Sequence, residues 1–141
     1  MKKILIINSN YYKEISNNLL LNVKKKLIRT TFQASVINVP GIFEIPSIIR
    51  MYINKFDGFI ALGCVIKGQT PHFDFICYST FNAIINLSIN FNKPIGNGII
   101  TALNINQAKY RSEESKFKKP NKGLEAANAV ITILNNGPKK I

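Results

Sequence analysis

The segment 68–72, with the sequence Gly-Gln-Thr-Pro-His, holds the residues best suited to chemistry in this chain. It follows an apolar stretch, and Thr70 and Pro71 are typical of the N-cap and first position of a helix. His72, the single histidine of the sequence, then lies in the first helical turn. Backbone N–H groups at a helix start attract anions, and the helix dipole there disfavours an imidazolium. The segment therefore predicts a phosphate cradle beside a neutral histidine, which is the form that acts as a general base.

A purely structural interpretation of the same segment stays open at this point. Strand–turn–helix junctions with one histidine also occur in α/β proteins that do no chemistry at the junction. The elements that surround the segment have to decide between the two interpretations.

The spacing of apolar residues predicts strands and helices in alternation. Strands are expected at 3–8, 34–39, 59–66 and 94–101, and helices at 14–29, 44–54, 71–90, 104–110 and 123–135. The first helix repeats apolar residues every four positions on one face: Ile15, Leu19, Val23 and Leu27. The stretch 59–66 is almost entirely apolar, as are parallel strands covered on both faces. With right-handed crossovers, this order predicts one α/β domain over residues 1–141, a three-layer α/β/α sandwich with a four-stranded parallel, flavodoxin-like sheet.

Polar and aromatic residues follow every predicted strand, and such folds bind ligands at the carboxyl ends of their strands. These residues are Asn10, Tyr11 and Tyr12 after the first strand, 40–44 after the second, 68–72 after the third, and Thr101 and Asn104 after the fourth. Tyr11 and Phe43 follow strand ends, where a ring can face a flat ligand, although either ring can also belong to the core. This edge of the sheet is therefore the predicted binding site.

The chain is strongly basic, with a formal net charge of +12 and a sequence pI near 9.9. Such an excess can indicate nucleic-acid binding. The lysines are spread along the chain, however, and aromatic residues do not alternate with them as they do in a base-stacking surface. An anionic small-molecule substrate is therefore the favoured partner, and no nucleic acid is expected.

The composition is that of a globular protein, with 46% apolar and 18% charged residues. No apolar run approaches the roughly 20 residues of a membrane-spanning helix, so no membrane partner is expected. Cys64 and Cys77 lie in apolar segments. They indicate buried, reduced thiols in a cytoplasmic protein and not a disulfide framework.

Five segments, in order along nearly the whole chain, resemble the lumazine synthase family. Residues 40–46, PGIFEIP, are similar to the family's PGAFEIP, and residues 61–75, ALGCVIKGQTPHFDF, to its ALGCVIRGETPHFDY. Residues 94–101 resemble its fourth strand, 106–108 its EQA segment, and 121–127 its NKGxEAA segment. The resemblance implies condensation of 5-amino-6-(D-ribitylamino)uracil with 3,4-dihydroxy-2-butanone 4-phosphate. The products are 6,7-dimethyl-8-ribityllumazine, phosphate and water, and no metal or redox cofactor takes part.

The resemblance also implies a role for each matching residue. Stacking on the pyrimidinedione falls to Tyr11, and proton transfer to His72. The ring edge and ribityl chain fall to Glu44 and to backbone at Ile42, Phe43, Cys64, Val65 and Ile66. The phosphate falls to Gln69, Thr70 and Arg111. Asn97 stands where the family often has a phenylalanine that reaches the pyrimidine from the adjacent subunit, so contact there is expected through its amide. A role for Lys122 near the phosphate, and of Asp74 in orienting His72, stays open.

The family works as a pentamer with active sites between subunits, and some members assemble twelve pentamers into a shell. We expect an isolated or at most paired pentamer here. Little chain precedes the first strand, and the linker 111–122 is longer than the corresponding turn of shell-forming relatives. Its Lys116, Lys118 and Lys119 would also crowd like charges at a contact between pentamers. Riboflavin synthase is a further partner that the resemblance raises.

Two alternatives come from other classes of protein. A flavodoxin-like sheet with aromatic residues at its carboxyl edge can be a flavin- or nucleotide-binding module without catalysis. A basic scaffold for nucleic acid would show steeply salt-dependent DNA binding.

Overall fold

A parallel four-stranded sheet forms the centre of the computed structural model, which describes residues 1–114 and 121–138. The strands are β1 (Lys3–Ser9), β2 (Gln33–Val39), β3 (Gly58–Ile66) and β4 (Ile95–Ala102). Their order in the sheet is β2-β1-β3-β4, and every neighbouring pair is parallel. The chain therefore builds outward from β1 in one direction and then from β3 in the other. The winding of the chain therefore reverses where β1 and β3 lie side by side.

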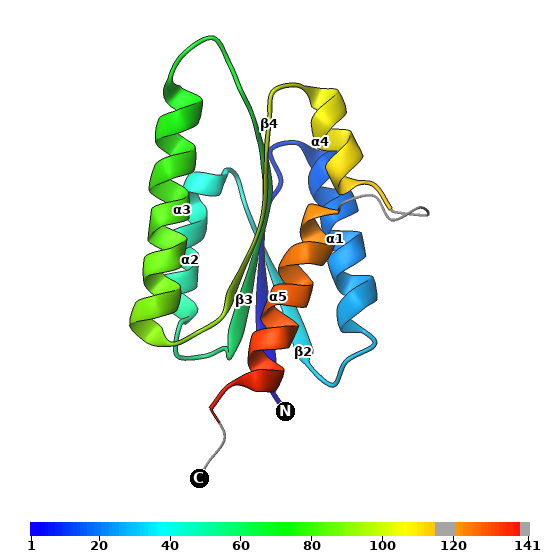
Figure 1. The fold of residues 1–141 in the computed structure, drawn as a ribbon, viewed down its shortest axis with the longest axis vertical. Helices are drawn as coiled ribbons and strands as arrows, with labels where there is room; N and C mark the ends of the chain where they lie inside the picture. The colour runs from blue at the N-terminus through cyan, green and yellow to red at the C-terminus, as the bar shows by residue number, and fades with distance from the viewer. Residues whose placement is uncertain (115–120, 139–141) are drawn as a thin grey trace.

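Helices cover both faces of this sheet, as Figure 1 shows with the sheet seen on edge. One layer holds α2 (Ile45–Tyr52) and α3 (His72–Phe91), with the short 3₁₀ turn η1 (Ile42–Glu44) leading into α2. The opposite layer holds α1 (Lys13–Leu27), α4 (Ile105–Ser112) and α5 (Lys122–Asn136). The expected three-layer α/β/α fold with a parallel sheet is thus confirmed.

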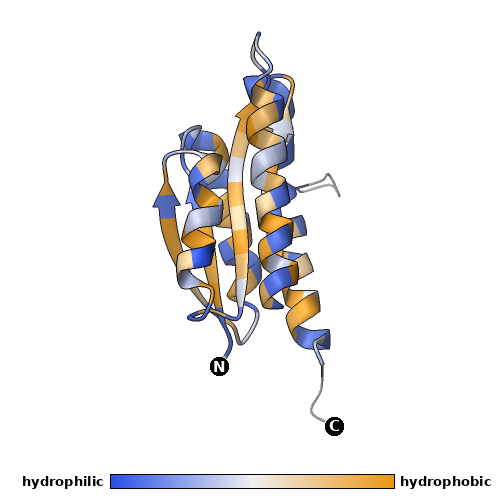
Figure 2. Ribbon diagram, turned by 90° about the vertical axis from the view of Figure 1, so that its left-hand side faces the viewer, coloured by the Kyte–Doolittle hydropathy of each residue, from blue (hydrophilic) through white to orange (hydrophobic). Residues whose placement is uncertain are grey.

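Each face of the sheet has its own apolar core because strand side chains alternate between faces. Ile4 and Ile6 point toward α1, whereas Leu5 and Ile7 point toward α2 and α3. All four expected apolar positions of α1 are buried in the first of these cores. Figure 2 looks onto the layer of α2 and α3, and apolar residues recur along its helices.

The helix at the start of the chemical segment differs from the sequence-based expectation. Thr70 makes no capping hydrogen bond, and Pro71 occupies the N-cap position, with its carbonyl oxygen accepting from Phe75 N at 3.2 Å. Proline fixes φ but suits either position, so the helix begins one residue later than predicted. His72 still opens the first turn of α3, as expected.

Other expectations have mixed outcomes. The apolar spacing of α3 would place Ile85 inward beside Ile84, but Ile84 is 4% exposed and Ile85 is 53% exposed. Cys64 and Cys77 are both free and buried, as predicted. Lys116, Lys118 and Lys119 lie outside the described residues. In the described part of the chain no helix is long and apolar enough to cross a membrane.

Candidate active site

A cavity of about 490 Å³ opens at the carboxyl ends of β1 and β3, where the winding of the sheet reverses. Open α/β sheets bind ligands at this topological position because the loops diverge there and leave a crevice. The lining residues come from three strand ends and the start of α3: Ser9, Tyr11, Tyr12, Gly41, Ile42, Phe43, Glu44, Cys64, Val65, Ile66, His72 and Ile76. The topology therefore joins residues that are up to 67 positions apart in sequence.

The chain turns sharply after β1 and presents two aromatic rings to the cavity. The Tyr11 side chain is 74% exposed, and its ring meets that of Tyr12 edge-on at 5.0 Å between centroids. Tyr12 is half-buried, and burial raises the pKa of its hydroxyl, with smaller contributions from Cys64 and Tyr11. The exposed face of Tyr11 leaves room for a flat ligand.

The turn after β2 supplies the second wall. Ile42 is buried and anchors η1 on the core, whereas Phe43 is 60% exposed. A Cβ at Gly41 would lie 3.0 Å from Glu44 Oε2, so the Glu44 carboxylate folds back over the Gly41 backbone. Glycine at this point lets the carboxylate lie against the turn, at the edge of the cavity.

The third wall is the end of β3, which runs past the end of β1. The register between these strands stops at Asn8 and Leu62, but β3 continues to Ile66. Pro94 O accepts from Phe59 N and Ala102 O from Lys67 N, each at 2.9 Å, so odd-numbered residues of β3 direct their backbone groups toward β4. Even-numbered Cys64 and Ile66 therefore direct theirs to the opposite side, where the cavity lies.

The Cys64 thiol lies in this wall but is only 6% exposed. Burial raises its pKa to about 11. The thiol is therefore protonated at neutral pH, which argues against a nucleophilic role for Cys64.

His72 lines the cavity at the N-terminus of α3 and is exposed. No side chain caps this helix, so the first backbone N–H groups are not taken up by a capping residue. Among the described residues no hydrogen bond or ion pair joins His72 to Asp74. Asp74 instead raises the pKa of the Cys77 thiol, after the larger effect of burial. The geometry thus gives no support for Asp74 as a partner of His72.

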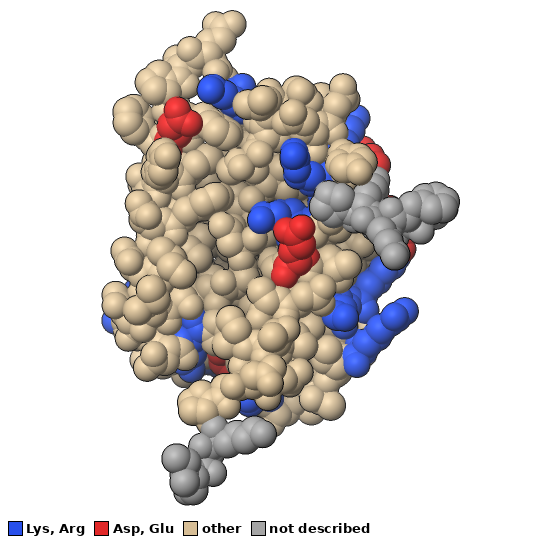
Figure 3. Space-filling model, viewed as in Figure 1, with Lys and Arg blue, Asp and Glu red and all other residues tan. Residues whose placement is uncertain are grey.

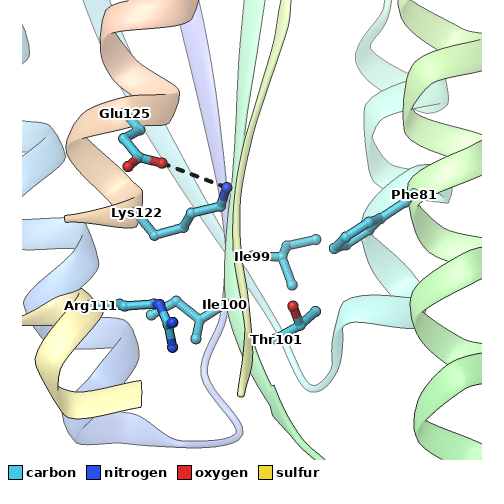
Figure 4. A pocket seen from close by; sticks show the side chains of 7 residues that line it. All are labelled: Phe81, Ile99, Ile100, Thr101, Arg111, Lys122 and Glu125. Atoms are coloured by element: carbon cyan, nitrogen blue, oxygen red, sulfur yellow. Dashed lines mark ion pairs between the residues drawn. The ribbon is translucent and has the colours of Figure 1, made fainter. Parts of the chain in front are cut away.

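The expected phosphate ligands are not all brought to this cavity within one chain. Gln69 and Thr70 are exposed on the loop between β3 and α3. Arg111 lines a different cavity of about 300 Å³ along the free edge of β4, together with Phe81, Ile99, Ile100, Thr101, Lys122 and Glu125 (Figure 4). Asn97 is also on β4, where its Oδ1 accepts from Ile99 N at 3.1 Å. Arg111 and Asn97 are therefore separate from His72 in a single copy.

Asn121 holds the two cationic residues of this β4-edge cavity side by side. Its Nδ2 donates to the carbonyl oxygens of Ser112 and Glu113 at the end of α4, both at 3.0 Å. Its Oδ1 accepts from Leu124 N at 2.9 Å and caps α5. The Lys122 ammonium lies 3.6 Å from the Glu125 carboxylate and shares the cavity with Arg111. On the face drawn in Figure 3, which includes this edge, basic side chains outnumber acidic ones.

Four residues of the first cavity were given no substrate contact by the sequence: Ser9, Tyr12, Gly41 and Ile76. Tyr12 and Gly41 belong to the strand-end segments that the sequence already placed at the predicted binding edge. Ser9 and Ile76 carry no such signal, because a serine at a strand end and an isoleucine on a helix are ordinary core residues. Among the described residues, no group of three or more histidine, cysteine or acidic side chains could hold a metal ion.

These features define a class: an α/β protein with an aromatic, hydrogen-bonding crevice at its switch point and an exposed histidine at its rim. A family model described as 6,7-dimethyl-8-ribityllumazine synthase matches residues 1–137, and the chain belongs to this family. It is thus a transferase of riboflavin biosynthesis.

Relatives that carry the name 6,7-dimethyl-8-ribityllumazine synthase match most of the chain. One from Campylobacter jejuni subsp. jejuni is 38% identical over 138 residues, which cover 94% of this chain and 88% of the relative. One from Bartonella bacilliformis is 34% identical over 134 residues, covering 92% and 88%. One from Methylorubrum populi is 33% identical over 139 residues, covering 94% and 80%. The similarity thus extends across both cavities.

Proposed function

We propose that the cavity between β1 and β3 binds 5-amino-6-(D-ribitylamino)uracil. The observation that supports this most is the convergence of the exposed Tyr11 ring with the backbone of the β3 overhang. The ring would stack on the pyrimidinedione. Backbone at Cys64 and Ile66 and at Ile42 and Phe43, with the Glu44 carboxylate, would bond the ring edge and the ribityl hydroxyls. The Val65 backbone faces β4, so Val65 would only line the cavity. Exposed apolar and polar groups of this kind match a flat, polyhydroxylated ligand.

His72 is the residue that we assign to proton transfer. The 5-amino group attacks the ketone of 3,4-dihydroxy-2-butanone 4-phosphate and loses water to form an imine. Phosphate leaves, the chain tautomerises, and the second amine closes the ring with loss of water. Each step moves a proton, and His72 at the rim of the cavity would supply or accept it. General acid–base catalysis of this kind contributes about 10²–10⁴-fold, and the rest of the acceleration comes from holding two reactants together.

The phosphate group is assigned to Gln69, Thr70 and Arg111, with a second copy of the chain completing the site. Arg111 has a guanidinium fork that suits phosphate oxygens, but it lies in the β4-edge cavity and not with His72. A neighbouring copy that brings its β4 edge, with Asn97 and Arg111, to the first cavity would join the two halves. This arrangement is a homo-oligomer with its active sites between subunits.

We further propose that the oligomer is a pentamer. α3 exposes a row of large apolar side chains that a second copy could cover: Phe75, Tyr78, Ile85 and Ile89. Light scattering should give about 80 kDa, five times the chain mass of 15.9 kDa. A particle near one megadalton would instead indicate a closed shell. A stable, active monomer would contradict the shared site.

One assay tests the proposed use of the cavity. Mixing both substrates with the protein should produce the fluorescent lumazine, and the rate should depend on both concentrations. Riboflavin binding without turnover would favour the non-catalytic flavin-binding alternative.

The free buried thiols support action in a reducing, cytoplasmic compartment. The two apolar cores lie on opposite faces of one sheet, which supports a single domain over the chain. A pull-down with riboflavin synthase would test that partner.

A further inference from the structure

Ser9, the last residue of β1, holds a buried hydroxyl that has no partner among the described residues. Its side chain is on the same face of the sheet as Leu5 and Ile7, and the residue is 2% exposed. The Oγ atom makes no hydrogen bond. Buried hydroxyls in proteins are nearly always hydrogen-bonded, because leaving one unpaired costs folding free energy that an alanine would not. A hydroxyl at this position therefore needs a reason other than the fold.

No described protein group forms a hydrogen bond with the Ser9 hydroxyl, although the residue lines the cavity. A Cβ built on Gly63 would lie 3.0 Å from Ser9 Cβ and 2.8 Å from Ile42 Cγ2, so these residues pack closely around it. The neighbouring backbone is already engaged, since Val39 O accepts from Asn10 N at 3.1 Å. Ser9 nevertheless lines the 490 Å³ cavity together with Ile42 and Cys64. The Oγ atom is closed to solvent in this conformation, so the serine must turn about χ1 toward the cavity to reach a ligand there.

Among the described residues, two other buried side chains have an unpartnered oxygen, and they show what sets Ser9 apart. Asn8 Oδ1 belongs to an amide whose Nδ2 donates to Asn38 Oδ1 at 3.1 Å, and Thr80 Oγ1 lies on α3. Neither residue lines the substrate cavity. Of the three, Ser9 alone combines an unpaired polar atom with a place in that wall.

We propose that the Ser9 hydroxyl donates a hydrogen bond to an acceptor oxygen of the pyrimidine substrate, a ring carbonyl or a ribityl hydroxyl. This inference rests on the proposed use of the cavity for 5-amino-6-(D-ribitylamino)uracil. Because Ser9 is nearly inaccessible whereas Tyr11 is at the open rim, the bond forms at the floor of the cavity, below the stacked ring. Ser9 is then a binding residue for one substrate and does not touch the butanone phosphate.

The test compares Ser9→Ala with Thr80→Val, a matched loss of an unpartnered buried hydroxyl away from the cavity. Ser9→Ala should raise the KM for the pyrimidine about threefold to tenfold, the range of one neutral hydrogen bond, and leave the KM for the butanone phosphate unchanged. The dissociation constant of 6,7-dimethyl-8-ribityllumazine, followed by its fluorescence, should rise by a similar factor. Thr80→Val should change neither constant. Both variants without ligand should unfold at the same temperature as the parent chain or higher, because each loses an unsatisfied group.

An unchanged pyrimidine KM in Ser9→Ala would overturn the proposal. A lower unfolding temperature with equal losses for both substrates would overturn it as well, because the hydroxyl would then have a structural role. The parent chain is measured in the same assay. If it turns over both substrates while Ser9→Ala behaves like it, only the role of Ser9 fails and the proposed function stands.

Discussion

The two cavities of this chain differ in how many strand ends build them and in the groups that they offer. The cavity between β1 and β3 has three walls from one copy, including the rings of Tyr11, Tyr12 and Phe43, a strand overhang and the Glu44 carboxylate. The cavity at the edge of β4 is smaller, holds Arg111 and Lys122, and lies along the outer strand of the sheet that the described residues form. The first offers aromatic faces and backbone hydrogen-bonding groups that suit a flat ligand. The second offers two cationic side chains.

This difference follows from the position of each cavity in the sheet. A switch point lies in the middle of the sheet and collects loops from strands on both sides, whereas an edge strand has loops on one side only. A reaction that joins a flat pyrimidine to a phosphorylated ketone needs both an aromatic surface and fixed cations. If one reaction uses both cavities, they must come from different copies of the chain, and the variants below should affect them separately.

The largest expected effect is that of His72→Ala in the first cavity. Turnover should fall about 100-fold or more without being abolished, since general acid–base catalysis is worth about 10²–10⁴-fold and positioning of the reactants remains. Steady-state rates with both substrates measure this. His72→Gln is the control for size and polarity. Rates that match the parent chain across neutral pH would remove His72 from the mechanism.

Arg111→Ala in the β4-edge cavity should act mainly on the other substrate. Losing one charged phosphate ligand costs about 1.5–3 kcal/mol, which corresponds to roughly a 10- to 150-fold weaker butanone phosphate. The KM values of the two substrates, and inhibition by inorganic phosphate, distinguish this outcome. Lys109→Ala, on the same short helix, is the control for a general loss of positive charge. A defect confined to the pyrimidine would contradict the assignment.

Mixing the two defective variants sharpens the comparison further. If His72 of one copy works with Arg111 of its neighbour, co-refolded His72→Ala and Arg111→Ala chains should recover activity in about a quarter of the sites. If both residues act within one copy, no mixture recovers activity. This result decides directly whether the two cavities belong to one site.

How far the sequence alone predicts the molecule also differs between the two cavities. The four strands and five α-helices of the described residues fall close to the expected boundaries, because periodic apolar residues report burial directly. Most of the first cavity follows from strand-end positions. The proposed role of Ser9 at the end of β1 does not follow from its position. It depends on an unpaired hydroxyl, which results from the packing of Gly63 and Ile42 around the side chain.

The β4-edge cavity is harder to predict. Sequence spacing does not reveal that β4 is the outer strand, and so does not reveal that Arg111 is separate from His72 in one chain. The start of α3 was misplaced for a local reason, since Pro71 fits the N-cap as well as the first helical position. Tertiary packing, and not propensity, decides both points.

Asn121→Ala should damage the β4-edge cavity while sparing the first one. The change removes a helix cap and two hydrogen bonds that join α4 to α5. Because Asn121 is only 3% exposed, the free energy of unfolding should fall by about 1–3 kcal/mol. The butanone phosphate should bind more weakly because Arg111 and Lys122 lose their spacing. Asn104→Ala, which removes only the exposed cap of α4, should cost about 1 kcal/mol and leave binding unchanged. Equal losses for both substrates in Asn121→Ala would show that the cavities are not independent.

The smallest expected effect concerns alkali and the wall of the first cavity. Above the ordinary thiol pKa near 9 the unfolded chain releases the Cys64 proton, whereas the folded chain keeps it up to about pH 11. The folded state then binds more protons, so the free energy of unfolding falls by about 1.4 kcal/mol for each pH unit in this window. Urea titrations at pH 8, 9 and 10 measure the slope, and Cys64→Ala should flatten it. Cys77→Ala is the matched control, because its thiol is outside the first cavity and its pKa is raised less.

Adding 6,7-dimethyl-8-ribityllumazine should protect Cys64 from slow alkylation at pH 9 but leave Cys77 unprotected. If the ligand protects both thiols equally, occupancy of the first cavity tightens the whole chain, and the contrast between the two regions fails.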